Sequence, residues 1–299
     1  MENLTPVILF VYNRPEHTRQ AVEYLSKNRL AESSRLFIFS DGSKNEKDKQ
    51  KVSEVREFIK SIRGFQEIII IEREKNFGLA DSIISGVTKI INQYEKVIVL
   101  EDDIVTSPFF LTFMNEALEF YQKDDSIFTI SGYNYPVHIP KDYPFQVYLS
   151  PRSSSWGWGT WKVRWEKVDW KPNKELLLNN KKSLNSLLDK AGKDLAPMLL
   201  KSIEGKINSW AVRAAFTQAK RNSYTIFPIK SLAKNVGTDA SGTNFIRKTR
   251  KYDVELEVEK MKFEFTPNLN PNYEIVSQII RLVRPGILSF IKYRLFSIY

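Results

Sequence analysis

The chain has 299 residues, of which 42% are hydrophobic and 27% are charged, a balance that is ordinary for a soluble globular protein and excludes a disordered architecture. It contains no cysteine, which excludes disulfide bonds, thiolate zinc sites and a cysteine nucleophile. A chain of this length predicts one main domain with an appended subdomain.

The formal net charge is +10, and Lys and Arg are spread along the whole sequence. This balance favours anionic partners, namely nucleotides, acidic lipids or nucleic acid, without choosing among them. The apolar run at residues 7–12 is too short for a signal peptide or a membrane span, and no basic segment precedes it. We therefore expect a cytoplasmic protein.

Short runs of apolar residues alternate with longer amphipathic stretches in the first half. Four runs predict buried parallel strands, because each is apolar at consecutive positions rather than at alternate ones; they lie at residues 7–11, 36–39, 68–71 and 97–100. Helices are expected between them, at residues 15–28, 46–62 and 79–93. The order βαβαβαβ predicts an α/β fold with a sheet flanked by helices.

Polar residues follow each of the four predicted strands. Because the ligands of open α/β sheets bind beyond the carboxyl ends of the strands, we expect these segments to line one pocket. Any one of them alone would indicate only a turn, since Asp-Gly and Asn-x-Gly are ordinary turn formers. The segments are Tyr12-Asn13-Arg14-Pro15, Ser40-Asp41-Gly42-Ser43, Asn76-Phe77-Gly78 and Glu101-Asp102-Asp103.

The last of these segments is a run of three acids, Glu101, Asp102 and Asp103. Their carboxylates would repel one another unless a cation or hydrogen-bond donors neutralise them. Carboxylate oxygens suit Mg²⁺ or Mn²⁺, which fill their remaining positions with phosphate and water. The triplet therefore predicts a metal site that bridges a diphosphate, and an acidic helix start is the simpler alternative.

The periodicity weakens after residue 133, which indicates a change of subdomain. Five of the six tryptophans fall between residues 150 and 170, and we expect Trp165 and Trp170 to cover the junction. A helix at residues 209–220 and a strand at residues 224–227 follow. The predicted division is a first half at 1–133, a second half of the same domain at 134–266, and a tail at 267–299.

The end of this tail is basic and amphipathic. Residues 281–299 contain four basic side chains, no acidic ones, and Ile, Leu, Phe and Tyr between them. The pattern suits a segment that lies on anionic lipid, which would make the protein peripheral at the inner face of the plasma membrane. A basic helix docked on the core explains it equally well.

The motifs Phe-x-Tyr-Asn-Arg-Pro, Phe-Ser-Asp-Gly, Asn-x-Gly-Leu-Ala and Val-Leu-Glu-Asp-Asp resemble those of bacterial glycosyltransferases of the GT-A fold. The chain is more closely similar to the branch related to N-acetylglucosaminyltransferase I, in which Glu-Asp-Asp replaces the more usual Asp-x-Asp. The resemblance implies a mixed sheet flanked by helices, with a nucleotide-sugar-binding half at 1–133 and an acceptor-binding and catalytic half at 134–266. It also implies transfer of a hexose or N-acetylhexosamine from a nucleotide sugar, UDP-sugar first, to a glycan or lipid-linked acceptor in surface polysaccharide synthesis, such as lipopolysaccharide or capsule.

Carried over residue by residue, the resemblance implies a base and phosphate site. Tyr12 and Arg14 would lie against the base and the phosphates, and Asp41 would accept a hydrogen bond from the uracil ring. The nucleotide would lie along a turn in which a glycine allows close backbone approach. This turn comprises Asn76, Gly78 and Ala80.

The same resemblance assigns roles to the acids. Asp102 would contact the ribose, Glu101 would lie beside the donor sugar, and Asp103 would bind Mn²⁺ or Mg²⁺ directly. A histidine is expected at position 244 in many relatives, and this chain has Asn244, whose oxygen is a weaker ligand for a hard cation.

Two further segments fit the family. In the tryptophan-rich segment, Trp156 and Trp158 would stack on sugar rings, and Arg152 is a candidate contact for phosphate or acceptor. Residues 234–244 resemble the loop that closes over the diphosphate, with Gly237 and Gly242 as hinges. An ordinary surface loop is the alternative.

The catalytic base departs from the family pattern. An inverting transferase needs a carboxylate to take the proton from the acceptor hydroxyl, and relatives carry an aspartate just before a tryptophan at a helix start. This chain has Asn208 in the corresponding stretch, and an amide cannot act as a base. Asp239 is the first alternative and Glu204 the second; a retaining mechanism or a weakened variant would also explain the change.

Three other classes of protein are weighed against this hypothesis. A nucleotidyltransferase of similar fold usually has a glycine-rich loop near its N-terminus, and residues 5–20 contain no glycine. A nucleic-acid-binding protein would explain the charge, but no binding motif is present and the acid triplet would repel phosphate without metal. A catalytically weak relative that binds sugar nucleotides would explain Asn208.

Overall fold

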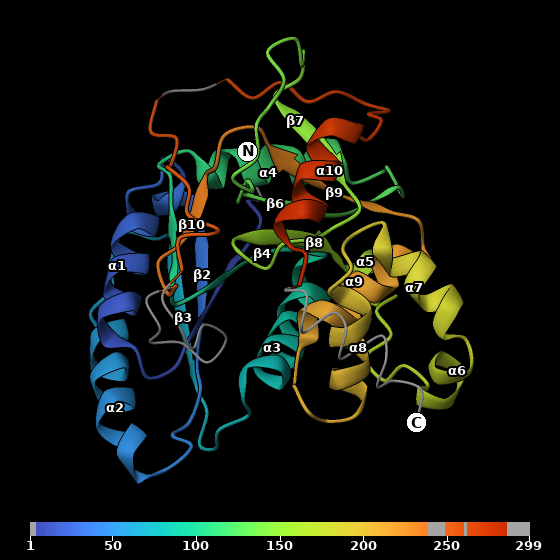
Figure 1. The fold of residues 1–299 in the computed structure, drawn as a ribbon. Helices are drawn as coiled ribbons and strands as arrows, with labels where there is room; N and C mark the ends of the chain where they lie inside the picture. The colour runs from blue at the N-terminus through green and yellow to red at the C-terminus, as the bar shows by residue number, and fades with distance from the viewer. Residues whose placement is uncertain (1–3, 239–248, 260–261, 286–299) are drawn as a thin grey trace.

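The structure is a computed structural model that describes residues 4–238, 249–259 and 262–285 (Figure 1). Asp239 and Asn244, predicted as base and metal ligand, and Gly242, predicted as a hinge, lie outside these described residues. So do residues 286–299 of the basic tail.

One eight-stranded mixed sheet runs through the molecule, with strands in the order β3-β2-β1-β4-β8-β6-β9-β7. β1 to β4 are mutually parallel where they pair, β6 and β9 run the same way, and β8 and β7 are antiparallel to their neighbours. A second, two-stranded antiparallel sheet pairs β10 with β5. The strands are β1 (Val7–Val11), β2 (Arg35–Ser40), β3 (Glu67–Glu72), β4 (Lys96–Glu101), β5 (Ile104–Thr106), β6 (Ile127–Ser131), β7 (Val147–Ser150), β8 (Trp158–Trp161), β9 (Tyr224–Pro228) and β10 (Ala233–Asn235).

Helices cover both faces of the large sheet (Figure 1). Side chains from α1, α2, α4 and α10 pack on one face, and side chains from α3, α5 and α9 pack on the other. The helices are α1 (Pro15–Ser26), η1 (Ala31–Ser33), α2 (Glu46–Lys60), α3 (Leu79–Tyr94), α4 (Phe110–Phe120), α5 (Lys162–Trp165), α6 (Lys174–Asn179), α7 (Lys181–Asp189), α8 (Leu195–Ile203), α9 (Trp210–Lys220) and α10 (Tyr273–Leu282).

The central strand β1 shows why the predicted strands are apolar at every position. Val7, Leu9 and Val11 point into the core under α1 and α4, whereas Ile8 and Phe10 point into the core under α3. Successive side chains of a strand face opposite sides, so a strand with helices on both sides must be apolar throughout. The α/β class with a mixed sheet flanked by helices is confirmed.

The elements predicted in the first half are all present, with ends that differ by one or two residues. The helix predicted at 209–220 and the strand predicted at 224–227 are also confirmed. Residues 174–203, for which no elements were predicted, form the three short helices α6, α7 and α8. Their leucines make a separate small core against α9.

The described part of the tail is docked rather than free. α10 buries Ile275 and Ile279 completely against the core under β6 and β9. This helix precedes most of the basic segment at 281–299, of which the structure describes residues 281–285, so the two interpretations of that segment stay predictions. Within the described residues, no helix is both long and apolar enough to cross a membrane.

Candidate functional site

The carboxyl ends of β1, β2, β3 and β4 meet at one edge of the sheet. In the parallel register Val11 lies opposite Ser40, Ser40 lies opposite Glu72, and Phe10 lies opposite Glu101. The four polar segments predicted to line one pocket therefore begin side by side. This shared edge is the candidate site.

Arg14 links the loop after β1 to the acid triplet. Its Nε donates to Asp102 Oδ1 at 3.2 Å, its Nη2 makes a still closer contact with the same oxygen, and Nη2 lies 2.7 Å from Asp103 Oδ2. Arg14 and both aspartates are largely buried, which strengthens their interaction. A protein cation therefore neutralises part of the charge that the sequence assigned to a metal.

The part of the acid-triplet charge that Arg14 does not neutralise is unfavourable in this buried site. Burial raises the pKa of Glu101 well above its ordinary range, and the charges of Asp103 and Asp102 raise it further. Burial also raises the pKa of Asp102, against the opposing effect of Arg14. For Arg14, burial lowers the pKa, but the two aspartates outweigh it and the net shift is upward. The buried carboxylates therefore favour further positive charge beside that of Arg14.

Two buried atoms of this cluster have no hydrogen-bond partner among the described residues. They are Asp103 Oδ1 and Arg14 Nη1, one acceptor and one cationic donor. An unpartnered buried polar atom is costly unless a ligand or ion completes it. The pair is suited to a divalent cation at the carboxylate and an anionic oxygen, such as a phosphate oxygen, at the guanidinium. No group of three or more His, Asp or Glu side chains forms a metal cluster in the described residues.

The beginning of the predicted closing loop lies directly over these acids. β10 pairs with β5, which follows the triplet, and Val236 donates its backbone N–H to the Asp103 carbonyl at 2.9 Å. A Cβ on Gly237 would lie 2.3 Å from Asp103 Oδ2 and 2.8 Å from Arg14 Nη1. Only glycine allows the backbone to approach this closely.

Asp41 holds together the two neighbouring loops. Its carboxylate accepts backbone N–H bonds from Phe77 at 2.9 Å and 3.0 Å, from Gly78 at 3.0 Å and from Gly42 at 3.1 Å. Asn76 Nδ2 adds a bond to the Gly42 carbonyl at 2.8 Å, and Gly78 adopts φ +73. The predicted nucleotide-binding turn is thus pre-formed, and it leads into α3 with Ala80 buried. Asp41 already uses its acceptor capacity on this turn, whereas the resemblance assigned it to a uracil ring.

Replacing Asp41 with alanine is expected to destabilise this turn, because three amide groups, one buried and two partly buried, lose their acceptor. We expect the free energy of unfolding to fall by about 2–3 kcal/mol and the amides of Phe77 and Gly78 to lose protection in hydrogen exchange. Ser43→Ala, at the same loop, is the control. Unchanged protection of the two amides would show that the backbone alone holds the turn.

Tyr12 is oriented by the first turn of α2. Its hydroxyl donates to Asp48 Oδ2 at 3.0 Å and accepts the Lys44 amide at 2.9 Å, while Asn13 Nδ2 donates to Asp48 Oδ1 at 2.8 Å. Burial raises the pKa of Tyr12 above its ordinary value. Asp48 was not singled out from the sequence, where it stands as an ordinary first-turn acid of a helix.

The tryptophan-rich segment divides between core and surface. Trp158 is 2% exposed, and its ring stacks on Trp210 at 4.8 Å and on Trp165 at 5.7 Å between centroids. Because it presents no open face, the expectation that Trp158 stacks on a sugar is corrected to a packing role. Trp165 is buried and Trp170 lies against it, as expected for residues that cover the junction. Trp156 remains half-buried, with its ring edge-on to Tyr133 at 4.6 Å.

Arg152 is engaged within the protein. It makes a two-point ion pair with Asp194, with both N–O distances at 2.8 Å, and donates to the Tyr135 hydroxyl and the Ala191 carbonyl. The pair ties the loop after β7 to the segment before α8. The prediction that Arg152 contacts phosphate or acceptor is corrected, since its donors already have internal acceptors.

The described candidates for a base are poor ones. Asn208 is exposed and its Oδ1 accepts a hydrogen bond from Arg213, which also donates to the Ser209 and Trp170 carbonyls. Glu204 is paired with Lys206 at 2.6 Å, and the hydrogen bond from Lys206 lowers the pKa of Glu204. A lower pKa means a weaker affinity for the acceptor proton.

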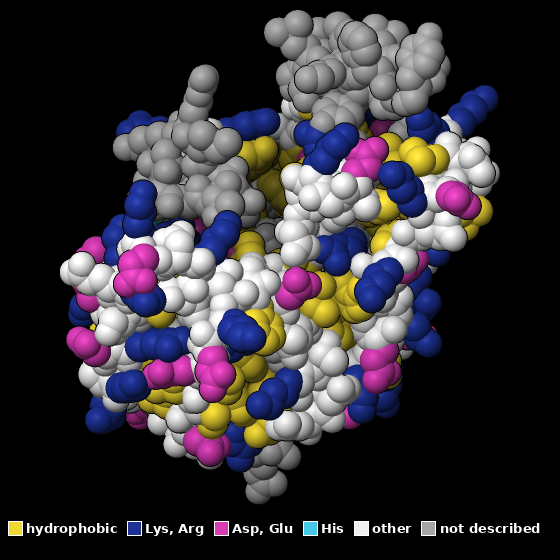
Figure 2. Space-filling view, turned by 90° about the horizontal axis from the view of Figure 1, so that it is seen from below, with side chains coloured by type: hydrophobic (Ala, Val, Ile, Leu, Met, Phe, Trp, Pro, Cys, Tyr) yellow, Lys and Arg dark blue, Asp and Glu magenta, His cyan; other side chains and the backbone are white. Residues whose placement is uncertain are grey.

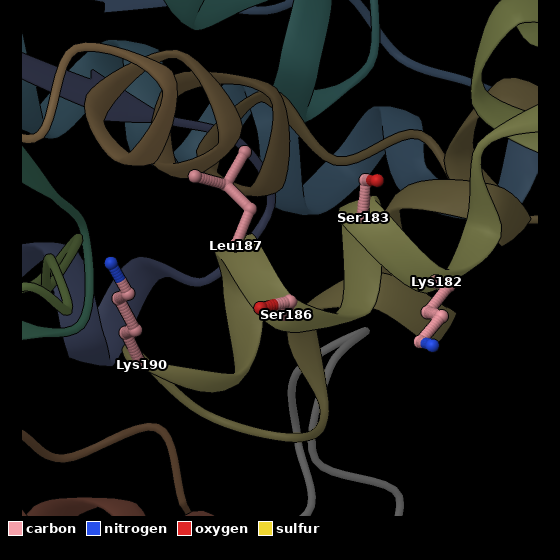
Figure 3. A pocket seen from close by; sticks show the side chains of 5 residues that line it. All are labelled: Lys182, Ser183, Ser186, Leu187 and Lys190. Carbon is pink, nitrogen blue, oxygen red and sulfur yellow. The ribbon is translucent and has the colours of Figure 1, made fainter.

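Two surface hollows lie away from this edge. One, of about 540 Å³, is lined by segments around Asn134, Lys230 and residues 253–259. The other, of about 450 Å³, lies beside α7, where Lys182, Ser183, Ser186, Leu187 and Lys190 line it (Figure 3). Neither contains a residue from the ends of β1 to β4.

Positive and negative side chains are mixed on the face of the molecule that Figure 2 shows. On this face, Lys and Arg side chains are interspersed with Asp and Glu side chains instead of forming one basic patch. The net charge of +10 therefore does not translate into a uniform basic surface on this side.

Several solved structures are similar to this chain at low sequence identity. The mannosyltransferase PcManGT from Pyrobaculum calidifontis, in complex with GDP-Man and Mn²⁺, has 14% identity and a TM-score of 0.40 over 57% of this chain. TarS from S. aureus has 12% identity and a TM-score of 0.43 over 79% of this chain, and its fragment 1–349 in complex with UDP has 12% and 0.40 over 77%. The chain spans 48%, 37% and 60% of the lengths of these three structures, respectively. No match was found among the curated proteins.

The sequence profile of the GNT-I family matches residues 1–173. The match covers more than half of the 299 residues and includes β1 to β4 with all four polar segments at their ends. It agrees with the resemblance drawn from the motifs. The chain belongs to the GNT-I family, a glycosyltransferase family.

Proposed function

We propose that the protein transfers a hexose or N-acetylhexosamine from a nucleotide diphosphate sugar, UDP-sugar first, to a glycan or lipid-linked acceptor. The observation that carries this proposal is the cluster of Arg14, Asp102 and Asp103, with one cationic donor and one carboxylate oxygen left for a ligand. A diphosphate with a divalent cation satisfies both. Family membership supports the same class of reaction.

The spacing of the sheet supports a nucleotide in this site. Asp41 follows β2 and Glu101 ends β4, with only β1 between them. Two strand spacings amount to roughly 10 Å. An extended nucleoside diphosphate reaches across this distance, with its base near the turn at 76–78 and its diphosphate near Arg14.

Asp103 is the residue that would hold Mn²⁺ or Mg²⁺, and the donor phosphates would complete the coordination. Such a cation supplies positive charge to the diphosphate as it leaves. The protein residues do the rest: Arg14 binds the phosphates, Glu101 and Asp102 border the sugar and the ribose, and Gly237 lets the closing segment exclude water. The proposal further includes that the reaction inverts the anomeric configuration and serves surface polysaccharide synthesis. It also places the protein peripherally at the inner face of the plasma membrane.

Titration calorimetry of UDP, GDP and TDP into the purified protein tests the proposal, with Mn²⁺ or with EDTA. We expect one diphosphate to bind only with Mn²⁺, and Asp103→Ala to abolish this binding, because the cation loses its carboxylate. Asp125→Ala is the control, because this exposed acid lies just before the start of β6, at the opposite edge of the sheet. Absence of metal-dependent binding for all three nucleotides would refute the proposal.

A further inference from the structure

The N-termini of α3 and α9 lie at the same edge of the sheet as the acid triplet. α3 begins directly after the turn that Asp41 holds and ends next to the start of β4. α9 ends next to the start of β9, which runs parallel to β6 and hence to β4. Both helices therefore run from the carboxyl edge to the opposite edge, and they pack against each other (Figure 1).

Trp210 fixes the start of α9 close to the triplet. Its ring stacks on Trp158, 4.8 Å between centroids, and Trp158 lies opposite Val99 in the register of β4 and β8. Val99 is two residues before Glu101 in the same strand. The segment with Asn208 and Ser209, immediately before Trp210, is thus brought to the donor edge.

Arg213, in the first turn of α9, holds the segment that precedes this helix. Its guanidinium donates to Asn208 Oδ1, to the Ser209 carbonyl at 3.1 Å and to the Trp170 carbonyl at 3.3 Å.

Burial lowers the pKa of Arg213, and the nearby charge of Asp81 on α3 works against this shift. On α3, Asp81 stands two helical turns before Thr88, whose hydroxyl accepts a hydrogen bond from Trp165 Nε1 at 2.9 Å. Asp81 therefore lies on the face of α3 that points toward Trp165 and Trp210 at the start of α9.

Asp81 is exposed in the first turn of α3. It stands three residues after Gly78, whose amide is bound to Asp41. Asp81 thus supplies a carboxylate near the turn at 76–78 and near Asn208, the position at which relatives carry an acid.

On the basis of the proposed function, we propose that Asp81 is the catalytic base of the transfer. In the transfer step the acceptor oxygen bonds to the anomeric carbon of the sugar. The bond from that carbon to the diphosphate oxygen breaks, and its electron pair leaves with the diphosphate. The acceptor proton passes to the Asp81 carboxylate.

The test measures nucleotide binding and turnover in parallel. Turnover is followed as release of UDP from UDP-glucose and UDP-N-acetylglucosamine with Mn²⁺, water being the acceptor. We expect Asp81→Asn to lower kcat by about 10²–10⁴-fold while the Kd for UDP stays within about twofold. Glu175→Gln, which removes the equivalent first-turn acid of α6, is the matched control and should leave both values unchanged.

Added formate separates a base from a structural residue. We expect formate to restore turnover in Asp81→Gly, since a small carboxylate can occupy the vacated space and take the proton. Unchanged kcat in Asp81→Asn, loss of UDP binding along with turnover, or loss of turnover without formate rescue would each overturn the role as base. Failure of the unmodified protein to bind UDP would instead refute the proposed function itself, and the base assignment with it.

Discussion

Replacing Arg152 with methionine lowers the free energy of unfolding by about 3–5 kcal/mol, the largest stability effect that we expect from a single substitution here. The ion pair with Asp194 is largely buried, with side chains 14% and 18% exposed. Without Arg152, the Asp194 carboxylate keeps its desolvation cost and loses its cationic partner. Chemical denaturation monitored by tryptophan fluorescence measures the loss.

A second variant separates the buried charge from packing. Arg152→Met combined with Asp194→Leu removes both charges, and we expect it to regain most of the lost stability. Lys162→Met, which breaks an exposed ion pair with Glu95, should cost less than about 1 kcal/mol. A double variant as unstable as Arg152→Met would show that shape, rather than charge, sets the requirement.

Gly237→Ala is expected to weaken nucleotide binding by about tenfold, which corresponds to about 1.4 kcal/mol. The added methyl group would meet Asp103 Oδ2 at 2.3 Å and Arg14 Nη1 at 2.8 Å, and both groups are held by their mutual ion pair. The backbone at 235–237 must therefore move, and the bond from the Val236 amide to the Asp103 carbonyl is strained or lost. Titration of the nucleotide with Mn²⁺ measures the change.

Gly64→Ala is the control for a general effect of adding a methyl group. It lies in a turn at φ +89 with nothing within 4 Å of the new methyl, so it should lower stability slightly without changing nucleotide affinity. If Gly237→Ala bound the nucleotide as tightly as the unmodified protein, the backbone at 235–237 would have no part in nucleotide binding.

Local patterns predicted the first half of the fold well. The strands around Val7 and Val97 and the helix at Leu79 are continuous apolar or amphipathic runs bounded by turn residues, so nearby residues determine them. The shared edge of the four strand ends also followed, because parallel strands must place their carboxyl ends together. The match to the GNT-I family confirmed the resemblance to glycosyltransferases that the motifs indicated.

The contacts that decide individual roles were not accessible from the sequence, because they join distant segments. Asp41 binds amides 36 and 37 residues away, and Arg14 pairs with an acid 88 residues away. Burial of Trp158 depends on Trp210, which no local pattern associates with it. Arg213 could have been noticed as a basic residue one helical turn after Ser209, and Asp81 as the acid that directly follows Asn-x-Gly-Leu-Ala.

The position of β8 has a consequence for biosynthesis. This strand lies between β4 and β6, so the edge of β4 stays unpaired until residues 158–161 have been synthesised. The four central residues of β4 are valine, isoleucine, valine and leucine, and an apolar strand with free N–H and C=O groups pairs readily with other chains. A nascent or truncated chain that stops before Trp158 therefore exposes this edge of β4 to other chains, and insertion of β8 covers it.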